Sequence, residues 1–219
     1  MLPKILIAIV FAAVAAYGAL LSWGTVALGS VATRMVAVRE NDAAGAAGLS
    51  QELNPWLSVP GLRSMAQQLD VQLAAGESLS RLQDSVEQSL RLTPAASADW
   101  LLLAQIRLAG GEPAAVVNQA LEYSIVTGRY ELAPMIGRVG LAVGIWSTLT
   151  PELQRQVIGE LGHVGGRLSR RQVEALKVRI AALPERDRVD IAGRLRAQYG
   201  GQIPRWGKSL GIEVQASKP

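Results

Sequence analysis

The sequence predicts an all-α protein with an N-terminal transmembrane helix, then stacked antiparallel helical hairpins, then a C-terminal helical extension. Three observations support this: an uncharged apolar run, prolines at a regular distance, and apolar residues at helical spacing between the prolines. The composition agrees, because the 219 residues include one Phe and are rich in Ala, Leu, Val and Gly. Few segments have the β-branched and aromatic runs that strands favour.

The first predicted element is the uncharged run Ile5–Thr33, with Lys4 before it and Arg34 after it. About 20 apolar residues span a bilayer as a helix, so the 29 residues of this run suffice with tilt. A cleaved signal peptide is the alternative, but a signal core has only about 7–15 apolar residues. We therefore predict a retained membrane anchor over residues 1–38. Its apolar side chains include Ile5, Ile9, Phe11, Val14, Leu20, Leu21 and Trp23.

The orientation of this anchor is weakly specified. Lys4 lies on one side of the run, and Arg34 and Arg39 lie on the other, so the positive-inside comparison is close to a tie. A short N-terminal tail with one Lys is typical of a signal-anchor, which favours a bacterial inner-membrane protein with its soluble domain in the periplasm. The chain has no Cys, which excludes disulfides and thiolate metal sites but does not fix the compartment.

Helical hairpins are predicted over residues 39–130. Pro55, Pro94 and Pro134 recur at intervals of 39 and 40 residues, as helix-stopping prolines do in stacked hairpins. Apolar residues between them follow helical spacing, and Gly76 and Gly110–Gly111 interrupt the pattern. Each unit is therefore expected to be a helix, a glycine turn and a second helix.

One of these units resembles a tetratricopeptide repeat. Trp100, Ala104, Gly111 and Ala120 fall at the offsets W-x3-A-x6-G-x8-A of that family. The preceding segment, residues 63–96, is similar more loosely and has Asp70 where a small residue is expected. The resemblance implies a fragment of an α-solenoid, with Trp100 buried between helices. The positions that it implies for repeat packing are Ala66, Gly76, Trp100, Ala104, Gly111 and Ala120.

The C-terminal third is expected to depart from the repeat. Residues 131–201 predict further amphipathic helices packed on the hairpins, and Thr150-Pro151 has the cap and first-turn proline of a helix start. Residues 202–219 predict an irregular tail. An anchor followed by a short repeat domain, with the segment Trp146-x-x-Leu149-Thr-Pro-Glu-Leu, resembles small accessory membrane proteins of bacterial exopolysaccharide and O-antigen loci.

The residues predict no catalytic centre, no metal site and no cofactor. His163 is the only histidine, and its neighbours supply no second ligand. The glycine-rich segment around it lacks the Lys-Ser/Thr of a phosphate-binding loop and follows a helix. No serine lies in a nucleophile elbow, and the carboxylates are spread along polar faces. We therefore expect a protein that is not an enzyme.

Charge gives the remaining indication of function. From His163 to the end there are twelve Lys/Arg and five Asp/Glu, a net of +7, whereas the preceding residues carry a net of −3. Such a basic block attracts an acidic glycan, anionic lipid or an acidic protein partner; a solvated surface without a partner is the alternative. Nucleic acid is disfavoured because interleaved aromatic residues are missing. The candidate basic residues are Arg167, Arg170, Arg171, Arg179, Arg186, Arg188, Arg194 and Arg196.

Two functions are compatible with this sequence. The first is a membrane-anchored protein-interaction scaffold whose hairpins hold a protein partner, serving as an accessory component of envelope polysaccharide biosynthesis or export. The second is a periplasmic factor that binds polysaccharide or an anionic surface through the Arg-rich C-terminal third.

Overall fold

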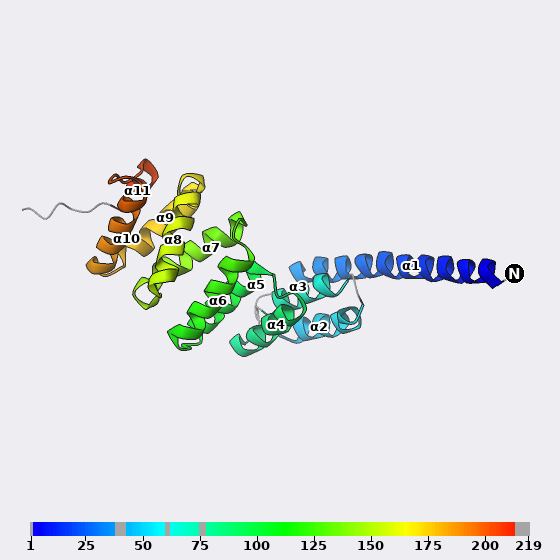
Figure 1. The fold of residues 1–219 in the computed structure, drawn as a ribbon. Helices are drawn as coiled ribbons and strands as arrows, with labels where there is room; N and C mark the ends of the chain where they lie inside the picture. Colours follow the sequence, from blue (N-terminus) through cyan, green and yellow to red (C-terminus); the bar gives the residue numbers. More distant parts are fainter. Residues whose placement is uncertain (1, 38–42, 60–61, 75–77, 213–219) are drawn as a thin grey trace, which may run out of the picture. The chain divides into compact units, whose positions relative to one another are not determined.

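A computed structural model describes residues 2–37, 43–59, 62–74 and 78–212 (Figure 1). These residues form α-helices and two 3-10 turns and contain no strand, which confirms the predicted all-α class. The chain divides into two compact units, Met1–Pro94 and Ala95–Pro219. This division lies inside the segment 39–130, which the sequence predicts as one set of hairpins.

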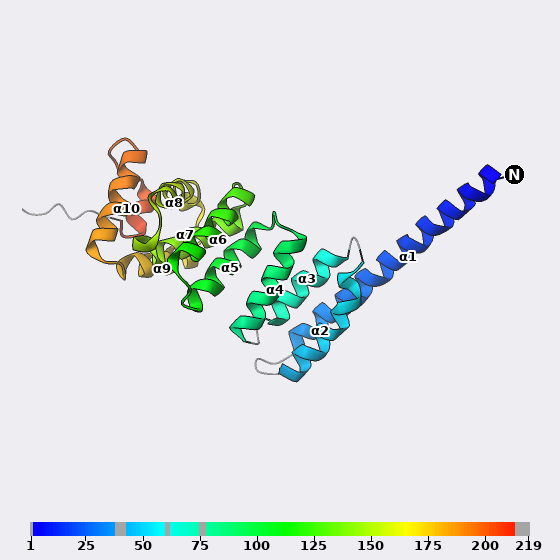
Figure 2. The ribbon, with the colours of Figure 1, turned by 60° about the horizontal axis from the view of Figure 1, so that its bottom comes forward.

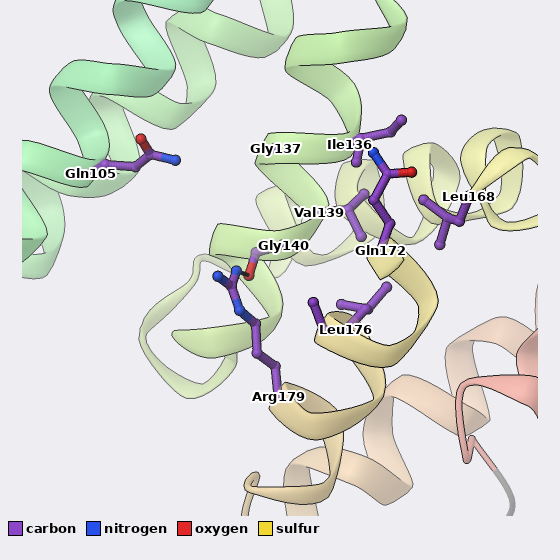
Figure 3. Close-up of a pocket in the computed structure, with 10 residues that line it drawn as sticks. Gln105, Ile136, Gly137, Val139, Gly140, Leu168, Gln172, Leu176 and Arg179 are labelled. Atoms are coloured by element: carbon purple, nitrogen blue, oxygen red, sulfur yellow. Dashed lines mark hydrogen bonds between the residues drawn. The ribbon is translucent and has the colours of Figure 1, made fainter. Parts of the chain in front are cut away.

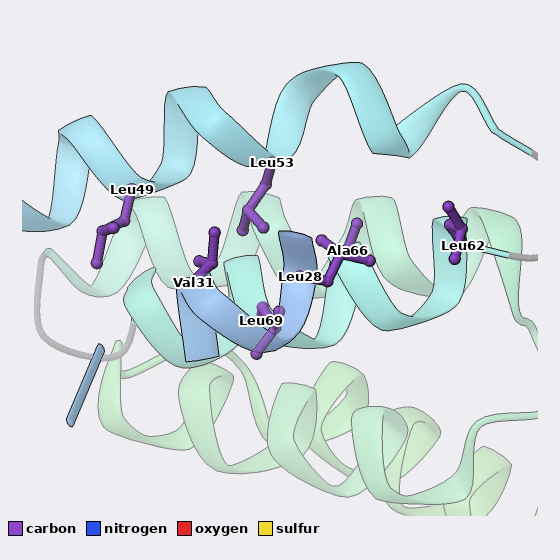
Figure 4. Close-up of a cluster of buried hydrophobic side chains, with 7 residues drawn as sticks. All are labelled: Leu28, Val31, Leu49, Leu53, Leu62, Ala66 and Leu69. Atoms are coloured by element: carbon purple, nitrogen blue, oxygen red, sulfur yellow. The ribbon is translucent and has the colours of Figure 1, made fainter. Parts of the chain in front are cut away.

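The first unit contains α1 (Leu2–Ala37), α2 (Ala43–Leu57), α3 (Arg63–Ala74) and α4 (Leu79–Leu92). Figures 1 and 2 show the C-terminal part of α1 running beside α2 and α3. A buried cluster joins these three helices (Figure 4), and it consists of Leu28, Val31, Leu49, Leu53, Leu62, Ala66 and Leu69. Gly24 permits the close approach of α1, because a Cβ there would collide with Leu62 Cδ1.

This packing divides the uncharged run into two parts. Leu28 and Val31 are buried in the cluster, whereas Val14 and Trp23 are 64% and 68% exposed. The C-terminal part of the uncharged run therefore contributes Leu28 and Val31 to the core of the first unit. Among the described residues, no helix combines the length and apolarity needed to cross a membrane.

The structure describes the side chains of only some of the other predicted anchor residues. Leu20 is exposed, and Leu21 is half-buried against the cluster. The side chains of Ile5, Ile9 and Phe11 lie outside the described residues.

The second unit contains α-helices of ten residues or more, two 3-10 turns and a short final helix. They are α5 (Ser97–Ala109), α6 (Ala114–Thr127), α7 (Leu132–Gly144), η1 (Trp146–Thr148), α8 (Pro151–Val164), η2 (Gly165–Arg167), α9 (Arg170–Ala181), α10 (Glu185–Gln198) and α11 (Arg205–Ser209). Within this unit α7 contacts α5, α6, α8 and α9, and α10 contacts α8. Helix α7 is therefore the centre of the packing (Figures 1 and 2).

A regular spacing of helix starts continues along the chain beyond residue 131. Helices α3, α5, α7 and α9 begin at residues 63, 97, 132 and 170, so that successive starts are 34, 35 and 38 residues apart. Helices α4, α6, α8 and α10 begin at residues 79, 114, 151 and 185. The helices of the C-terminal third therefore follow one another at a spacing similar to that of the preceding helices.

The predicted irregular tail is also wrong for part of its length. Residues Arg205–Ser209 form α11, which is held against η2. The reason is local: a Cβ on Gly165 would collide with the ring of Trp206, so only glycine lets this indole pack there. Residues 213–219 of the predicted tail lie outside the described residues.

Candidate interaction groove

A small apolar groove lies between α7 and α9, with Gln105 of α5 facing it (Figure 3). We call it the α7–α9 groove; its volume is about 200 Å³. The residues that line it are Gln105, Ile136, Gly137, Val139, Gly140, Leu168, Gln172, Ala175, Leu176 and Arg179. This volume is below the range of about 300–1,000 Å³ that is usual for metabolite sites. The groove therefore fits one or two side chains of a partner.

Two glycines of α7 line the groove, and each allows the close approach of a neighbouring side chain. A Cβ on Gly137 would lie 2.6 Å from Leu101 Cδ2, and a Cβ on Gly140 would lie 3.0 Å from Arg179 Nη1. The side chains of Leu101 and Arg179 therefore occupy the space beside these two glycines. The Gly140 carbonyl oxygen accepts a hydrogen bond of 2.6 Å from Arg179 Nη1. An apolar floor thus ends at a guanidinium group.

The predicted repeat-packing residues occupy different environments. Ala66 lies in the cluster of the first unit, and Ala104 and Ala120 are buried in the second. Gly111 adopts φ +70° in the turn after α5, where glycine avoids the strain of other residues. Gly76 lies outside the described residues.

The expectation that Trp100 is buried is wrong in degree. The indole is half-buried and lies against Tyr123 of α6, with ring centroids 4.6 Å apart. It does join the two helices of one hairpin, but from the edge of their interface. Tyr123 itself is exposed, so the aromatic pair stays at the surface.

Asp70, which departs from the repeat pattern, has a structural role in the first unit. Its carboxylate accepts hydrogen bonds from Ser50 Oγ at 2.6 Å, Ser85 Oγ at 2.7 Å and Arg81 Nη2 at 3.1 Å. These donors come from α2 and α4, whereas Asp70 belongs to α3. A polar junction therefore replaces the small apolar contact that the repeat resemblance implies.

The eight candidate basic residues do not form one uniform surface. Arg186 and Arg188 pair with Asp187 and Glu185 of their own helix. Arg194 binds Asp190 at 3.0 Å and also donates to Gln154 of α8. Half of the set is therefore either neutralised by neighbours or, like Arg179, committed to a backbone carbonyl.

The other half is arranged differently. Arg167, Arg170 and Arg171 are exposed around the start of α9, and no ion pair is found for them among the described residues. Arg196 is half-buried on α10. The free positive charge of the predicted surface is thus concentrated at the start of α9.

A buried ion pair in the second unit was not predicted from the sequence. Arg138 of α7 is fully buried, and its Nε donates to both oxygens of Glu160 of α8, at 2.9 and 3.0 Å. Its other nitrogens donate to the carbonyl oxygens of Ser124 and Gly128, at 3.0 and 3.1 Å. Burial raises the pKa of Glu160, and the hydrogen bond from Arg138 offsets part of that rise. A single Arg inside the apolar stretch 132–144 was the available signal.

The described residues contain no cluster of three or more side chains suited to a metal ion. His163 is exposed near the end of α8. The arrangement is that of an all-α protein with repeat-like helical hairpins. Comparisons with protein-family models, curated proteins and solved structures found no match.

Proposed function

We propose that this chain is a non-catalytic scaffold that binds a protein partner through the α7–α9 groove. The observation that carries the proposal is the apolar floor that ends at Arg179, on helices whose starts repeat every 34–38 residues. Stacked hairpins of the tetratricopeptide type present such surfaces to peptide segments. The resemblance of residues 97–130 to that repeat supports the same interpretation.

The chemistry of the groove defines the partner segment. Ile136 and Leu168 are half-buried and supply an apolar surface, and the Arg179 guanidinium has further N–H groups besides the one that binds Gly140. Arg binds carboxylates with two parallel hydrogen bonds, which fixes both position and direction. The proposed partner therefore presents an apolar side chain followed by a carboxylate. The net charge of +7 from His163 onwards favours an acidic partner as well.

The proposal also includes a single membrane anchor in the N-terminal part of α1, in a bacterial inner membrane with the soluble part in the periplasm. It is supported by the absence of charge from Ile5 to Trp23 and by the exposure of Val14, Leu20 and Trp23. Gly24, Leu28 and Val31 pack inside the first unit, whereas Val26 between them is 70% exposed. The layout supports a role as an accessory component of envelope polysaccharide biosynthesis or export.

The groove is tested by filling it. Ala175 lines the groove and is exposed, so Ala175→Trp places an indole in it; Ala197→Trp, on the exposed face of α10, is the matched control. A random peptide library is panned on the immobilised full chain in detergent. Enriched peptides should bind the parent and the Ala197 variant and lose at least tenfold in affinity for the Ala175 variant. Equal binding to both variants contradicts the proposal.

A second candidate function is binding of an anionic surface by the start of α9. It is favoured by the exposed residues Arg167, Arg170 and Arg171, for which no acidic partner lies among the described residues. Replacing all three with Ser should weaken binding to vesicles that contain anionic lipid or to an acidic polysaccharide, and should flatten its salt dependence. Exposed substitutions of this kind change stability by about 0.5 kcal/mol or less.

A further inference from the structure

A second and larger cavity lies in the second unit, and it shares no lining residue with the α7–α9 groove. It is formed by the end of α6, the turn after it and one face of α8. We call it the α6–α8 cavity; its volume is about 660 Å³. Cavities of about 300–1,000 Å³ accommodate small molecules. The size of this cavity therefore fits a ligand as large as a sugar ring, which the α7–α9 groove does not.

One face of α8 supplies a wall of the cavity. Gln156, Gly159, Glu160 and His163 line it, at the spacing i, i+3, i+4 and i+7 that places residues on one side of a helix. Gly159 lies in the middle of this row, and a Cβ there would meet no atom within 4 Å. The helix therefore has open space where the row of side chains is interrupted.

The polar groups of the cavity call for a ligand with both a negative charge and a hydrogen-bond donor. Glu160 accepts with both oxygens from the buried Arg138, so its charge is compensated. Arg129 is exposed without an ion pair among the described residues, and His163 offers a ring N–H. The Oε1 atom of Gln156 is buried and has no hydrogen-bond partner among the described residues. This acceptor needs a donor such as a hydroxyl group.

The rim of the cavity is apolar and aromatic. Tyr130 is 88% exposed and Val126 is 69% exposed, and both line the opening. Tyr and Arg are enriched among the residues that contribute most of the binding energy in interfaces. A flat ligand with one apolar face would cover both side chains and exclude water from the Arg129 contact.

From these groups we propose that the α6–α8 cavity binds an acidic sugar, a pyranose ring that carries a carboxylate. The carboxylate binds Arg129, a ring hydroxyl donates to Gln156 Oε1, and the apolar face of the ring covers Tyr130. An acidic peptide offers the carboxylate, but it has no polyhydroxylated ring to match the unpaired acceptor and the aromatic rim together. This site is separate from the α7–α9 groove, so either proposal can fail alone.

The test uses sodium glucuronate, with glucose as the neutral sugar, and the full chain in detergent micelles. Binding is measured by titration with saturation-transfer NMR. Gly159→Leu adds a side chain at the wall of the cavity, where a Cβ would meet no atom within 4 Å; Gly193→Leu, on α10, is the matched control because a Cβ there also meets no atom within 4 Å. We expect at least a tenfold loss of glucuronate affinity for the Gly159 variant and less than a twofold change for the control.

A second variant addresses the ligand class. Arg129→Gln should reduce glucuronate affinity at least tenfold and leave glucose binding unchanged, while Ala175→Trp in the other groove should change neither. The proposal is overturned if the parent does not bind glucuronate or if the Gly159 variant binds it as tightly. It is also overturned if a glutamate-rich peptide, and not glucuronate, shows binding that depends on the open space at Gly159.

Discussion

Arg138 of α7 connects three segments of the second unit. Its guanidinium reaches Glu160 of α8, and the carbonyl oxygens of Ser124 and Gly128 at the end of α6. All these groups are buried or end a helix, so each hydrogen bond replaces water that the folded chain excludes. Removing the guanidinium leaves a buried carboxyl and two carbonyl groups without this donor.

Replacing Arg138 with Met is therefore expected to lower the free energy of unfolding by about 3–5 kcal/mol, the usual cost of breaking a buried pair from one side. Arg155→Met is the control, because Arg155 is an exposed residue of α8 that pairs with Glu152 at the surface. Such surface pairs contribute about 0.2–1 kcal/mol. Denaturant unfolding of both variants in the same detergent checks this; equal losses would show that the buried pair has no special role.

The raised pKa of Glu160 gives stability a defined dependence on pH. The carboxyl ordinarily titrates at 4.5, and burial raises the pKa in the folded chain. Between these two values the folded chain holds a proton that the unfolded chain has released, so stability falls as pH rises. The stabilising effect of this proton is complete below 4.5 and is lost as pH rises through the raised pKa of the folded chain.

Glu160→Gln removes this titration and keeps a side chain of similar shape. The substitution also changes stability by an amount that does not depend on pH. We therefore compare the difference between the two free energies of unfolding, parent minus variant, and expect it to decrease as pH rises above 4.5. Denaturant unfolding at a series of pH values measures the difference. A difference that is constant or increases with pH would contradict the raised pKa.

The sequence identifies single residues well where local spacing decides their place. Ala104 and Ala120 are buried, as their position in one hairpin implies. The partners of Arg138 were not predictable in this way, because they come from helices whose packing has no signature at the level of one helix. The hydrogen bonds of Asp70 were not predictable for the same reason, because their donors belong to α2 and α4.

At the scale of elements, helix starts with strong caps follow from the sequence. Thr150 accepts from the Leu153 N–H, with Pro151 in the first turn, and Ser169 forms a capping box with Gln172. The end of α1 is different, because no residue within the uncharged run marks where lipid contact would stop and core packing begins. Only the close approach of Gly24 to α2 and to the residue before α3 defines that point.

The packing of α1 on α2 and α3 predicts a contrast between Gly18 and Gly24. Gly24→Leu inserts a side chain against Leu62 and Trp56, whereas a Cβ on Gly18 meets no atom within 4 Å. Overpacking a filled site costs about 1–3 kcal/mol, and both variants gain the same helix propensity. Limited proteolysis in detergent should therefore cut the first unit faster in the Gly24 variant and at the parental rate in Gly18→Leu. Equal rates would show that α1 does not pack on α2 and α3.

At the scale of the whole molecule, charge and apolarity are separated along the chain. Net positive charge lies from His163 onwards, within the second unit, and the uncharged run lies in the first. The sequence alone predicts this separation, because it depends only on composition. It does not predict the two units, since their boundary at Pro94 depends on which hairpins share a core.

We predict that the protein keeps its N-terminal residues, because cleavage inside the uncharged run would remove side chains that pack in the first unit. A leader peptidase acting at Ala27–Gly29 or Val31–Thr33 would remove Leu28, and cleavage after Thr33 would also remove Val31. Both side chains belong to the cluster of the first unit, so a cleaved chain loses part of its core. Deleting a buried Leu side chain alone costs about 2–5 kcal/mol, a large fraction of the stability of a typical domain.

We therefore expect the protein recovered from a bacterial host to keep its residues from Met1, to fractionate with the inner membrane, and to resist carbonate and high-salt extraction. Mass spectrometry of the intact chain measures the first property. Two truncated chains separate anchoring from folding: one that starts at Ser22 should leave the membrane and keep the protease resistance of the first unit, whereas one that starts at Arg34 should lose both. A mature protein that begins near Ser30 or Arg34 with a protease-resistant first unit would refute the anchor and the packing of α1 together.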